Sequence, residues 1–377
     1  MTEQKKRFAV SAGHICLDIT PAIAQNRRYN NISEYMVPGR LIPVGKPDIH
    51  TGGSVGNTGL AMKVLGADVK LMGKVGNDDF GRLVLEQVKE YGAGDGMIMA
   101  DGDETSYSVV VSVAGIDRII LHDSGANNTF CMTDIDFDLV RQASLFHFGY
   151  PSIMASMYQN EGQQLVMMMK KVKEMGVATS MDMAIVDEDS EAGQADWEKI
   201  IRRVIPYVDI FAPSVEELAF LIDRPRYHEW LERSQGRDIT EIISVEKDVR
   251  PLAEKLLKWG AKIILIKCGA PGLYFRTGSA EQISQVGGNL SLGVCAWADC
   301  EYFERSYKPE RILSGTGAGD TSIAAFLCAV LEGCPWEECL HLAAGTGASC
   351  VAAYDALSGL KSFSELREKI TAGWEKI

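Results

Sequence analysis

The sequence predicts an α/β protein built around one largely parallel sheet. Strand-like runs alternate with helical ones along almost the whole of its 377 residues, a pattern typical of repeated strand–helix–strand units. Two regions, 27–44 and 105–122, carry β-type patterns without a crossover helix. They predict a small separate sheet that lies as a lid over one edge of the main sheet.

The elements expected in the main part follow one another in a regular order. Strands are expected at 8–15, 69–72, 177–181, 209–212 and 262–266, and helices at 56–65, 79–91, 165–172, 215–222 and 252–259. A further helix follows residue 319, because Ile323, Phe326 and Leu327 fall on one helical face. Residues 224–248 are polar and charged, and they predict a surface insertion of helix and loop.

The chain shows no internal repeat, low-complexity tract or flexible linker. Its 46% hydrophobic and 24% charged residues are typical of a globular protein. We therefore expect residues 1–377 to form a single domain. Within it, the β lid is expected at about 24–46 and 104–123, and the insertion at about 224–248.

Charge and cysteine content exclude several classes of partner. The formal net charge is −13 and no dense Lys/Arg run occurs, so nucleic acid is not an expected partner. No apolar stretch approaches the length of a membrane span and no signal peptide is recognisable, so we expect no membrane contact and a cytoplasmic protein. The odd count of nine cysteines fits reduced intracellular thiols, and their spacing does not favour zinc.

The most informative motif is the glycine-rich segment 315–320, Gly-Thr-Gly-Ala-Gly-Asp, at the start of the helix that contains Ile323. At a helix N-terminus the backbone N–H groups lack intrahelical partners and the helix dipole favours anions. The segment is therefore suited to developing phosphate charge. Asp320 can either cap this helix or accept a proton from an attacking hydroxyl.

A second glycine-rich segment, 51–59, precedes a helix of small and apolar residues. Gly52 and Gly53 would let the backbone approach a ligand closely, and Asn57 offers both donors and an acceptor to the hydroxyls of a polyol. A helix start capped by Asn57 explains the same pattern. Asp18, which follows the first strand, could hold two sugar hydroxyls or lie in a solvated loop. In segment 73–81, a helix cap at Asn77 or Asp78 is the simpler interpretation.

Three common catalytic classes lack their motifs. No GxxxxGK[ST] segment occurs, so a P-loop is absent. The spacing of the glycines in 315–319 differs from that of the dinucleotide fingerprint, and the segment comes too late in the chain to open a first strand–helix–strand unit. No nucleophile elbow supports serine hydrolase chemistry.

Together these segments resemble the PfkB/ribokinase family of sugar and nucleoside kinases. Gly52, Gly53 and Asn57, with residues 66–81, are similar to its N-terminal signature, and residues 314–326 are similar to its C-terminal one. The resemblance covers about residues 8–360, and the two signatures occur in the family's order. It implies a ribokinase-like three-layer α/β/α fold with a mostly parallel central sheet and a β lid that often mediates dimerisation, so a homodimer through the lid is expected.

The resemblance also implies an activity and a set of site residues. The activity is ATP- and Mg²⁺-dependent phosphorylation of a hydroxyl group of a small carbohydrate, which could be a sugar, a sugar acid or a polyol. Asp320 would be the catalytic base, and the N–H groups of Gly317, Ala318 and Gly319 would form the anion hole. The sugar-binding positions match Asp18, Gly52, Gly53 and Asn57, with Asn128 in a similar segment. The ATP-binding positions match Lys267, Gly269, Gly272, Thr316, Gly317 and Gly319, and Asp182 falls near the phosphates.

Three departures from the family pattern have consequences. The family's Asn-x-x-Glu appears as residues 214–217, where Glu217 matches and would reach Mg²⁺ through water. Ser214 replaces the amide, so we expect an altered magnesium dependence with activity retained. Ser314 and Gly315 replace an Asp-Thr pair that helps to bind a monovalent cation, which leaves K⁺ activation in doubt. Lys267 stands where relatives often have a small hydroxyl residue, and it could contact ATP phosphates or point to solvent.

Other functions stay open at this stage. A nucleoside kinase of the same family would need an apolar or aromatic pocket, which residues 146–150 could supply. A phosphosugar kinase would need a further cation, for which Arg27, Arg28 and Arg118 on the expected lid are candidates. A non-catalytic sugar or nucleotide sensor would be indicated by a lost base or anion hole, and here Gly317, Gly319 and Asp320 are present.

Overall fold

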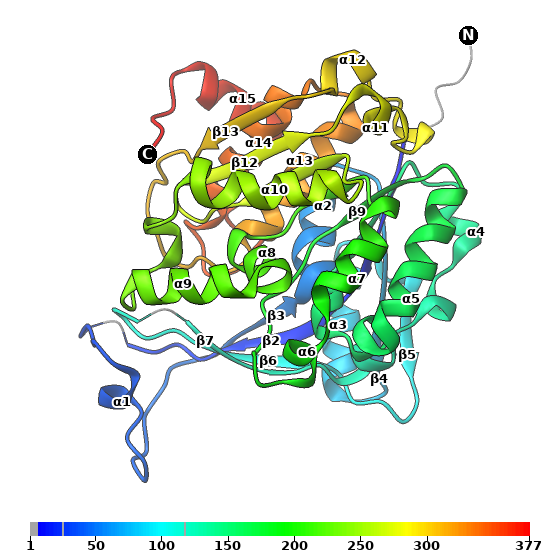
Figure 1. Cartoon of the computed structure of the whole chain (residues 1–377). Coiled ribbons are helices and arrows are strands. Elements are labelled where there is room, and N and C mark those ends of the chain that lie inside the picture. The colour runs from blue at the N-terminus through cyan, green and yellow to red at the C-terminus, as the bar shows by residue number, and fades with distance from the viewer. Residues whose placement is uncertain (1–6, 25, 117) are drawn as a thin grey trace.

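The computed structural model describes residues 7–24, 26–116 and 118–377 of the chain and has the predicted α/β architecture (Figure 1). Its larger sheet has nine strands in the order β13-β12-β11-β10-β9-β8-β1-β4-β5. The strands from β5 to β11 pair in parallel, while β12 and β13 are antiparallel. The strand bounds are β1 Ala9–Gly13, β4 Val69–Gly76, β5 Met97–Ala100, β8 Leu145–Gly149, β9 Ala178–Met181, β10 Ile210–Phe211, β11 Ile263–Lys267, β12 Gly272–Thr277 and β13 Glu301–Arg305.

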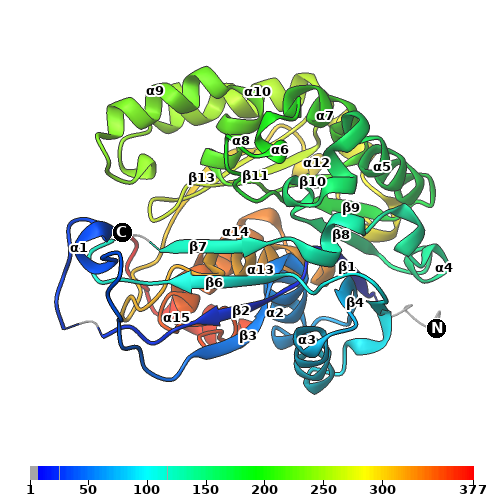
Figure 2. The same cartoon turned by 90° about the horizontal axis from the view of Figure 1, so that it is seen from below.

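Helices cover both faces of this sheet and so form the outer two of three layers (Figure 2). On one face lie α5 (Ala155–Glu174), α7 (Trp197–Val204), α8 (Val215–Ile222) and α10 (Arg250–Lys258). On the other lie α2 (Leu60–Val64), α3 (Asp79–Glu90), α13 (Ala318–Glu332), α14 (Trp336–Cys350) and α15 (Phe363–Thr371). The short helices are α1 Ile32–Tyr35, α4 Phe137–Val140, α6 Glu191–Gln194, α11 Ala280–Ser284 and α12 Val294–Trp297.

The two layers of helices enclose two hydrophobic cores, and β11 shows how one strand serves both. Successive side chains of a strand point to opposite faces of the sheet. Ile264 and Ile266 accordingly pack in the core beneath α5 and α8, whereas Ile263 and Leu265 pack in the core beneath α13 and α14. Because both faces are buried, the whole strand is apolar up to its last residue, Lys267.

A four-stranded sheet, here called the small sheet, stands apart from the larger one (Figures 1 and 2). Its strands β2 (Cys16–Thr20), β3 (Asp48–Gly52), β6 (Tyr107–Val111) and β7 (Ile119–Asp123) are arranged in the order β3-β2-β6-β7. The expected β segment at 104–123 therefore contains two of its strands. The first predicted strand, 8–15, ends early in β1, and the chain enters the small sheet from there.

The prediction of a β segment at 24–46 is wrong. The described residues of this segment form loops and the four-residue helix α1, and the strands lie on either side of it. Proline and glycine explain the difference, because proline cannot donate a ladder hydrogen bond and glycine weakens a strand. The residues concerned are Pro38, Gly39, Pro43 and Gly45. Asn31 instead caps α1 by accepting a hydrogen bond from the Ser33 N–H.

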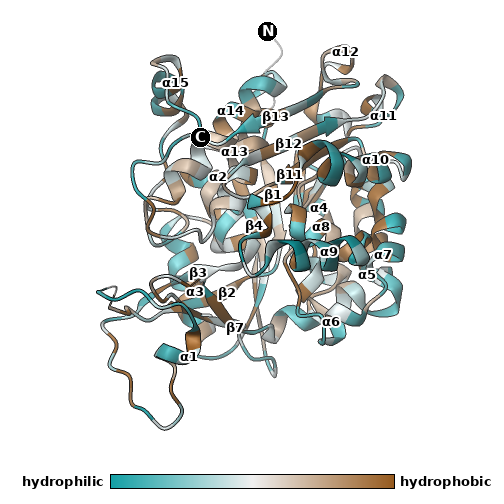
Figure 3. Ribbon diagram, turned by 60° about the vertical axis from the view of Figure 1, so that its left-hand side comes forward, coloured by the Kyte–Doolittle hydropathy of each residue, from teal (hydrophilic) through white to brown (hydrophobic). Residues whose placement is uncertain are grey.

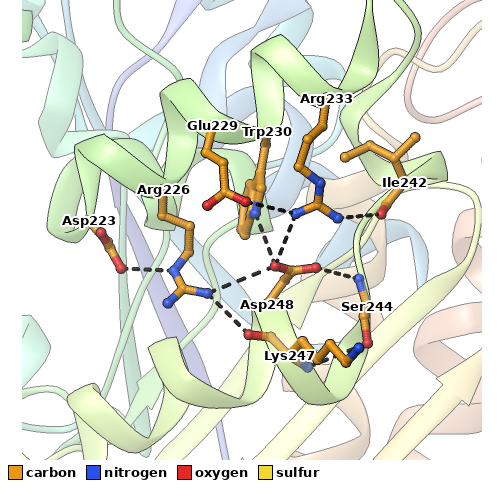
Figure 4. A network of polar contacts seen from close by, with 9 residues as sticks. All are labelled: Asp223, Arg226, Glu229, Trp230, Arg233, Ile242, Ser244, Lys247 and Asp248. Carbon is orange, nitrogen blue, oxygen red and sulfur yellow. Dashed lines mark hydrogen bonds and ion pairs between the residues drawn. The ribbon is translucent and has the colours of Figure 1, made fainter.

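The segment 224–248 begins with α9 (Arg224–Ser234), which is mostly hydrophilic (Figure 3), and continues through a 3₁₀ turn at Ile239–Glu241. Asp248 ties the segment together (Figure 4). Its carboxylate is 6% exposed and accepts hydrogen bonds from Trp230 Nε1 at 3.2 Å and from the Ser244 N–H at 2.7 Å. Arg233 Nη1 lies 3.4 Å away. A polar insertion thus holds its shape by satisfying one buried carboxylate.

In the described part of the chain, no helix is long and apolar enough to cross a membrane. Asp78 caps α3 by accepting from the Gly81 N–H at 2.7 Å, as the simpler interpretation of segment 73–81 expected. All nine cysteines are free thiols.

Replacing the carboxylate that organises the insertion should destabilise it. We expect Asp248→Ala to lower the free energy of unfolding by about 1–3 kcal/mol, because it leaves buried donors without an acceptor. Urea unfolding measures this. Glu229→Ala is the matched control, since Glu229 pairs with the same Arg233 from a side chain that is 62% exposed, and such a pair contributes about 0–1 kcal/mol. Equal effects of the two substitutions would contradict the prediction.

Candidate functional site

The candidate site lies at the carboxyl edge of the parallel strands. β1, β8 and β9 run in the same direction, so the residues that follow them, His14, Tyr150 and Asp182, emerge at one edge of the sheet. The last residue of β11, Lys267, reaches the same edge. In open α/β sheets this edge is where ligands bind. The N-terminus of α13 completes the arrangement.

Asp320 lies in the first turn of α13 but does not cap that helix, so the capping alternative is not what the structure shows. Its carboxylate is 6% exposed and is held from two sides. Asn57 Nδ2 donates to Oδ2 at 2.9 Å, and the Tyr150 hydroxyl donates to Oδ1 at 2.6 Å. Burial raises the pKa of Asp320, and the positive charge of Lys267 and these two hydrogen bonds oppose the rise.

The glycine-rich turn before α13 brings its backbone close to a lysine. Gly317 precedes the helix with φ 73°, in the left-handed region that glycine adopts without strain. A Cβ atom on Gly319 would lie 3.2 Å from Cδ and 3.8 Å from Nζ of Lys267, so the lysine lies against this turn. Lys267 is 9% exposed. The alternative in which it points to solvent is therefore wrong.

Lys267 faces a group of three acidic side chains. Its Nζ lies 3.9 Å from Glu217 Oε2, and it also acts electrostatically on Asp182 and Asp320. Burial raises the pKa of Asp182 and of Glu217, while Lys267 lowers them. His147 contributes no charge, because burial and the nearby Lys267 lower its pKa to about 3. Lys267 thus acts electrostatically on all three carboxyl groups.

Asp182 and Glu217 provide oxygen atoms that fit a hard cation. Asp182 is fully buried, and neither of its carboxylate oxygens has a hydrogen-bond partner. Glu217 Oε2 accepts from the Ser214 N–H at 2.6 Å in a capping box at the start of α8. Among the described residues no cluster of three or more His, Cys, Asp or Glu side chains is placed to hold a metal. Mg²⁺ suits such a site, since it keeps several waters and takes few protein ligands.

The predicted sugar-binding residues meet where the small sheet joins the larger one. Asp18 on β2 is 7% exposed, and a Cβ on Gly52 would collide with its carboxylate. A Cβ on Gly53 would likewise collide with His14. The ring of His14 lies 6.0 Å from that of Tyr150, measured between centroids. A series of neighbouring residues therefore runs from Asp18 through the two glycines and His14 to Tyr150, whose hydroxyl donates to Asp320.

The structure does not bring Asn128 into this group. Its side chain is exposed, and Oδ1 accepts from the Ala155 N–H at 3.0 Å. The preceding Asn127 is buried instead, where Oδ1 accepts from the Ile15 N–H at 3.0 Å and Nδ2 donates to the Ile15 carbonyl at 2.9 Å. Asn127 therefore fixes the chain between β1 and β2.

The predicted ATP-binding residues lie on two loops. Gly269 and Gly272 form the tight turn between β11 and β12, where the Cys268 N–H donates to the Gly272 carbonyl at 2.8 Å. Thr316 lies in the turn before α13, and its N–H donates to Ser314 Oγ at 3.0 Å. Thr240 of the 224–248 segment packs against Gly269, because a Cβ there would lie 2.8 Å from Thr240 Oγ1.

Sequence reasoning missed the role of Tyr150. It treated residues 146–150 as a possible aromatic pocket, yet Phe146 and Phe148 are fully buried in the core. Tyr150 has a left-handed backbone, with φ 63°, and its hydroxyl reaches Asp320. The available signal was its place between a glycine and a proline at the end of a strand, where a turn can redirect a side chain.

The chain is similar to proteins of one family. The family model described as "pfkB family carbohydrate kinase" matches residues 15–362. An uncharacterized sugar kinase from Archaeoglobus fulgidus is 26% identical over 304 residues, which cover 80% of this chain and 98% of that protein. Fructokinase-1 of Oryza sativa subsp. japonica is 24% identical over 338 residues, covering 87% and 84%.

Solved structures share the fold. Ribokinase of Arabidopsis thaliana, solved with ribose and ATP, has a TM-score of 0.67 at 21% identity and covers 96% of this chain and 98% of its own. Ribokinase from Giardia lamblia has a TM-score of 0.70 at 17% identity, covering 97% and 99%. At these identities the likeness confirms the ribokinase-like fold.

Removing the Tyr150 hydroxyl should raise the pKa of Asp320. Tyr150→Phe deletes a hydrogen bond to the ionised carboxylate and so disfavours the charged form. A carboxyl ¹³C NMR titration measures the pKa. Tyr158→Phe is the control, because its ring packs against Trp197, away from Asp320. An unchanged or lowered Asp320 pKa in Tyr150→Phe would contradict this.

Proposed function

This chain belongs to the pfkB family of carbohydrate kinases, and from that membership we propose that it transfers the γ-phosphoryl group of ATP to a hydroxyl group of a small carbohydrate. The acceptor is a sugar, a sugar acid or a polyol. The observation that carries the assignment of residues is the buried carboxylate of Asp320, held at the N-terminus of α13 by Asn57 and Tyr150.

Asp320 acts in this proposal as the general base. It accepts the proton of the attacking hydroxyl while an O–P bond forms to the γ-phosphorus and the bond to the β-phosphate oxygen breaks. A carboxylate with a raised pKa is the stronger base, provided that it is still ionised at working pH. The hydrogen bonds from Asn57 and Tyr150 favour the ionised form and fix its orientation.

The N–H groups of Gly317, Ala318 and Gly319 receive the negative charge of the transferred group. They lie at a helix N-terminus, where the dipole favours an anion. The Ala318 N–H makes only a long contact to the Gly315 carbonyl, at 3.4 Å, so an anion can replace it. Lys267 lies beside Gly319 and adds a full positive charge at the same place. On the sugar side, the acceptor is assigned to Asp18, Gly52, Gly53 and Asn57, whereas Asn128 is turned to Ala155.

ATP is assigned to the two loops that carry Gly269, Gly272 and Thr316. When bound, Mg²⁺ neutralises charge on the β- and γ-phosphates. Asp182 and Glu217 would hold it, directly or through water, because both carboxylates are close to Lys267, which packs beside the turn before α13. We propose that the enzyme does not depend on K⁺, since Ser314 and Gly315 offer no carboxylate to a monovalent cation.

Two features favour a free sugar over the alternatives. A nucleoside kinase would need aromatic faces for the base, and Phe146 and Phe148 are fully buried. A phosphosugar kinase would need a cation at the sugar end. Of the candidate cations, Arg27 lies in a loop with its guanidinium 4.8 Å from the centroid of the Tyr29 ring, and Arg118 lies against Gly315 in the turn before α13. A sensor without activity would not need the buried base that this chain retains.

We propose further that the whole chain acts as one kinase domain, with the small sheet as its lid, and that the enzyme is cytoplasmic, where its nine free thiols would stay reduced. We also propose a homodimer through the small sheet. Its strands β3 and β7 are edge strands, and Ile49, Ile120 and Leu121 on them are 40–57% exposed. Edge strands with apolar side chains are suited to pairing with another chain.

Light scattering tests the dimer. The wild-type protein should have about twice the 41.2 kDa mass of one chain, and Leu121→Lys should shift it toward one chain by placing a charge in the interface. Leu231→Lys on α9 is the control, since this leucine is 44% exposed and lies outside the small sheet. A wild-type monomer would contradict the proposal.

Turnover tests the base. Asp320→Asn should lower kcat by roughly 10²–10⁴-fold, because an amide cannot accept the proton. ATP affinity, measured by calorimetry, should change little. The assay is ADP release with Mg²⁺-ATP and a panel of sugars, sugar acids, polyols, phosphosugars and nucleosides, with and without K⁺. Asp79→Asn serves as control, since the Asp79 side chain is 90% exposed. Near-normal turnover of Asp320→Asn would overturn the assignment.

A further inference from the structure

The small sheet sends one cation toward the glycine-rich turn. Arg118 lies between β6 and β7, and a Cβ on Gly315 would lie 3.1 Å from its Nη1. The guanidinium therefore lies against the first glycine of the segment that ends in Asp320. Burial raises the pKa of Asp320 and of Cys350, and Arg118 is close enough to oppose both rises electrostatically.

The tip of the β6–β7 hairpin is held in place by its own small core. Ile23, Val111 and Val113 are buried there, with Tyr29 packed against them. The Tyr29 N–H donates to the Ala114 carbonyl at 2.8 Å. Ile116 and Ile119, which lie on either side of Arg118 in the sequence, also pack against this core. The side chain of Arg118 itself is exposed. This gives the loop segment around Tyr29, which was expected to be β, a structural role.

Two cations then flank one turn. Lys267 approaches Gly319 from the larger sheet, and Arg118 approaches Gly315 from the small sheet. The charge that develops in phosphoryl transfer lies on the oxygens of the transferred group. Guanidinium matches such oxygens because it presents several N–H donors in a planar fork.

We propose that Arg118 is a catalytic residue, which donates from the small sheet to the phosphoryl group as it passes from ATP to the sugar. This rests on the proposed function, because it requires the γ-phosphoryl group at the 315–320 turn. Arg118 forms no covalent bond. It stabilises the transferred group while Asp320 takes the proton and ADP leaves.

The lid then has a second role besides covering the acceptor. If the hairpin moved away from the turn, Arg118 would move with it, and the site would lose one of its two cations. Transfer to water without an acceptor would accordingly be slow whenever the small sheet stands open, since a closed site favours transfer to the bound substrate.

Steady-state kinetics on the full chain tests this. Arg118→Gln should lower kcat on the order of 10²–10³-fold, the effect of losing one donor to the transition state, with the KM of the sugar little changed. Arg118→Lys keeps the positive charge but loses the planar set of N–H donors, so its kcat should lie between those of the wild type and Arg118→Gln. Arg27→Gln is the control, because it removes one positive charge from the loop before α1, where the guanidinium lies over Tyr29. Millimolar guanidinium should restore part of the activity of Arg118→Ala.

A binding measurement separates this proposal from the kinase assignment. Calorimetry with Mg²⁺, ADP and aluminium fluoride, which mimics the transferred phosphoryl group, needs no acceptor. We expect Arg118→Gln to bind this mixture at least about tenfold more weakly than wild type, with ADP alone unaffected. Equal affinity, or a kcat within about twofold of wild type, would overturn the role of Arg118. If Asp320→Asn still abolishes turnover in that case, the kinase assignment stands without it.

Discussion

The balance between buried carboxylates and nearby cations determines what this site can hold. Asp320, Asp182 and Glu217 are brought together at the carboxyl edge of the sheet, and burial raises the pKa of each. The positive charge of Lys267 opposes this rise in pKa at each of the three carboxyl groups. ATP would add several more negative charges at the same place. The arrangement therefore favours a nucleotide that arrives with Mg²⁺, since a free polyanion would meet strong repulsion.

The larger sheet could be predicted from the sequence because its signals are local. Helix α8 has the predicted bounds, 215–222, since its apolar residues and capping box lie within one segment. The interruption of α5 explains why periodicity detected only its later part, for Gln159–Gly162 have non-helical dihedral angles. The end of β1 was misplaced for a non-local reason. Gly13, with φ 124°, lies directly against the backbone of Gly149, and the small sheet begins at Cys16.

The site was predictable in part. The 315–320 motif predicts a helix start suited to an anion, and the structure has that segment at the start of α13. The resemblance to a kinase family predicts Asp320 as the base. The partners of Asp320 could not be predicted, because Asn57 is 263 positions away and Tyr150 is 170 positions away in the sequence. Lys267 illustrates the same limit. Its sequence context leaves two directions open for the side chain, and only the packing of β11 against the turn decides between them.

The two sheets are joined differently at the two ends of the site. Within the small sheet, Gly52 on β3 lets the backbone lie directly against Asp18 on β2, and the next residue, Gly53, lies against His14, which follows β1 of the larger sheet. At the turn before α13, the long side chain of Arg118 lies against Gly315. Because β6 pairs with β2, with Ser108 opposite Asp18, a movement of the whole β6–β7 hairpin would disturb Asp18 as well as Arg118, whereas a change confined to the Arg118 side chain would not. On the proposed function, Asp18 and Arg118 would act from separate parts of one sheet, so a substitution of Arg118 would change turnover without changing recognition of the sugar.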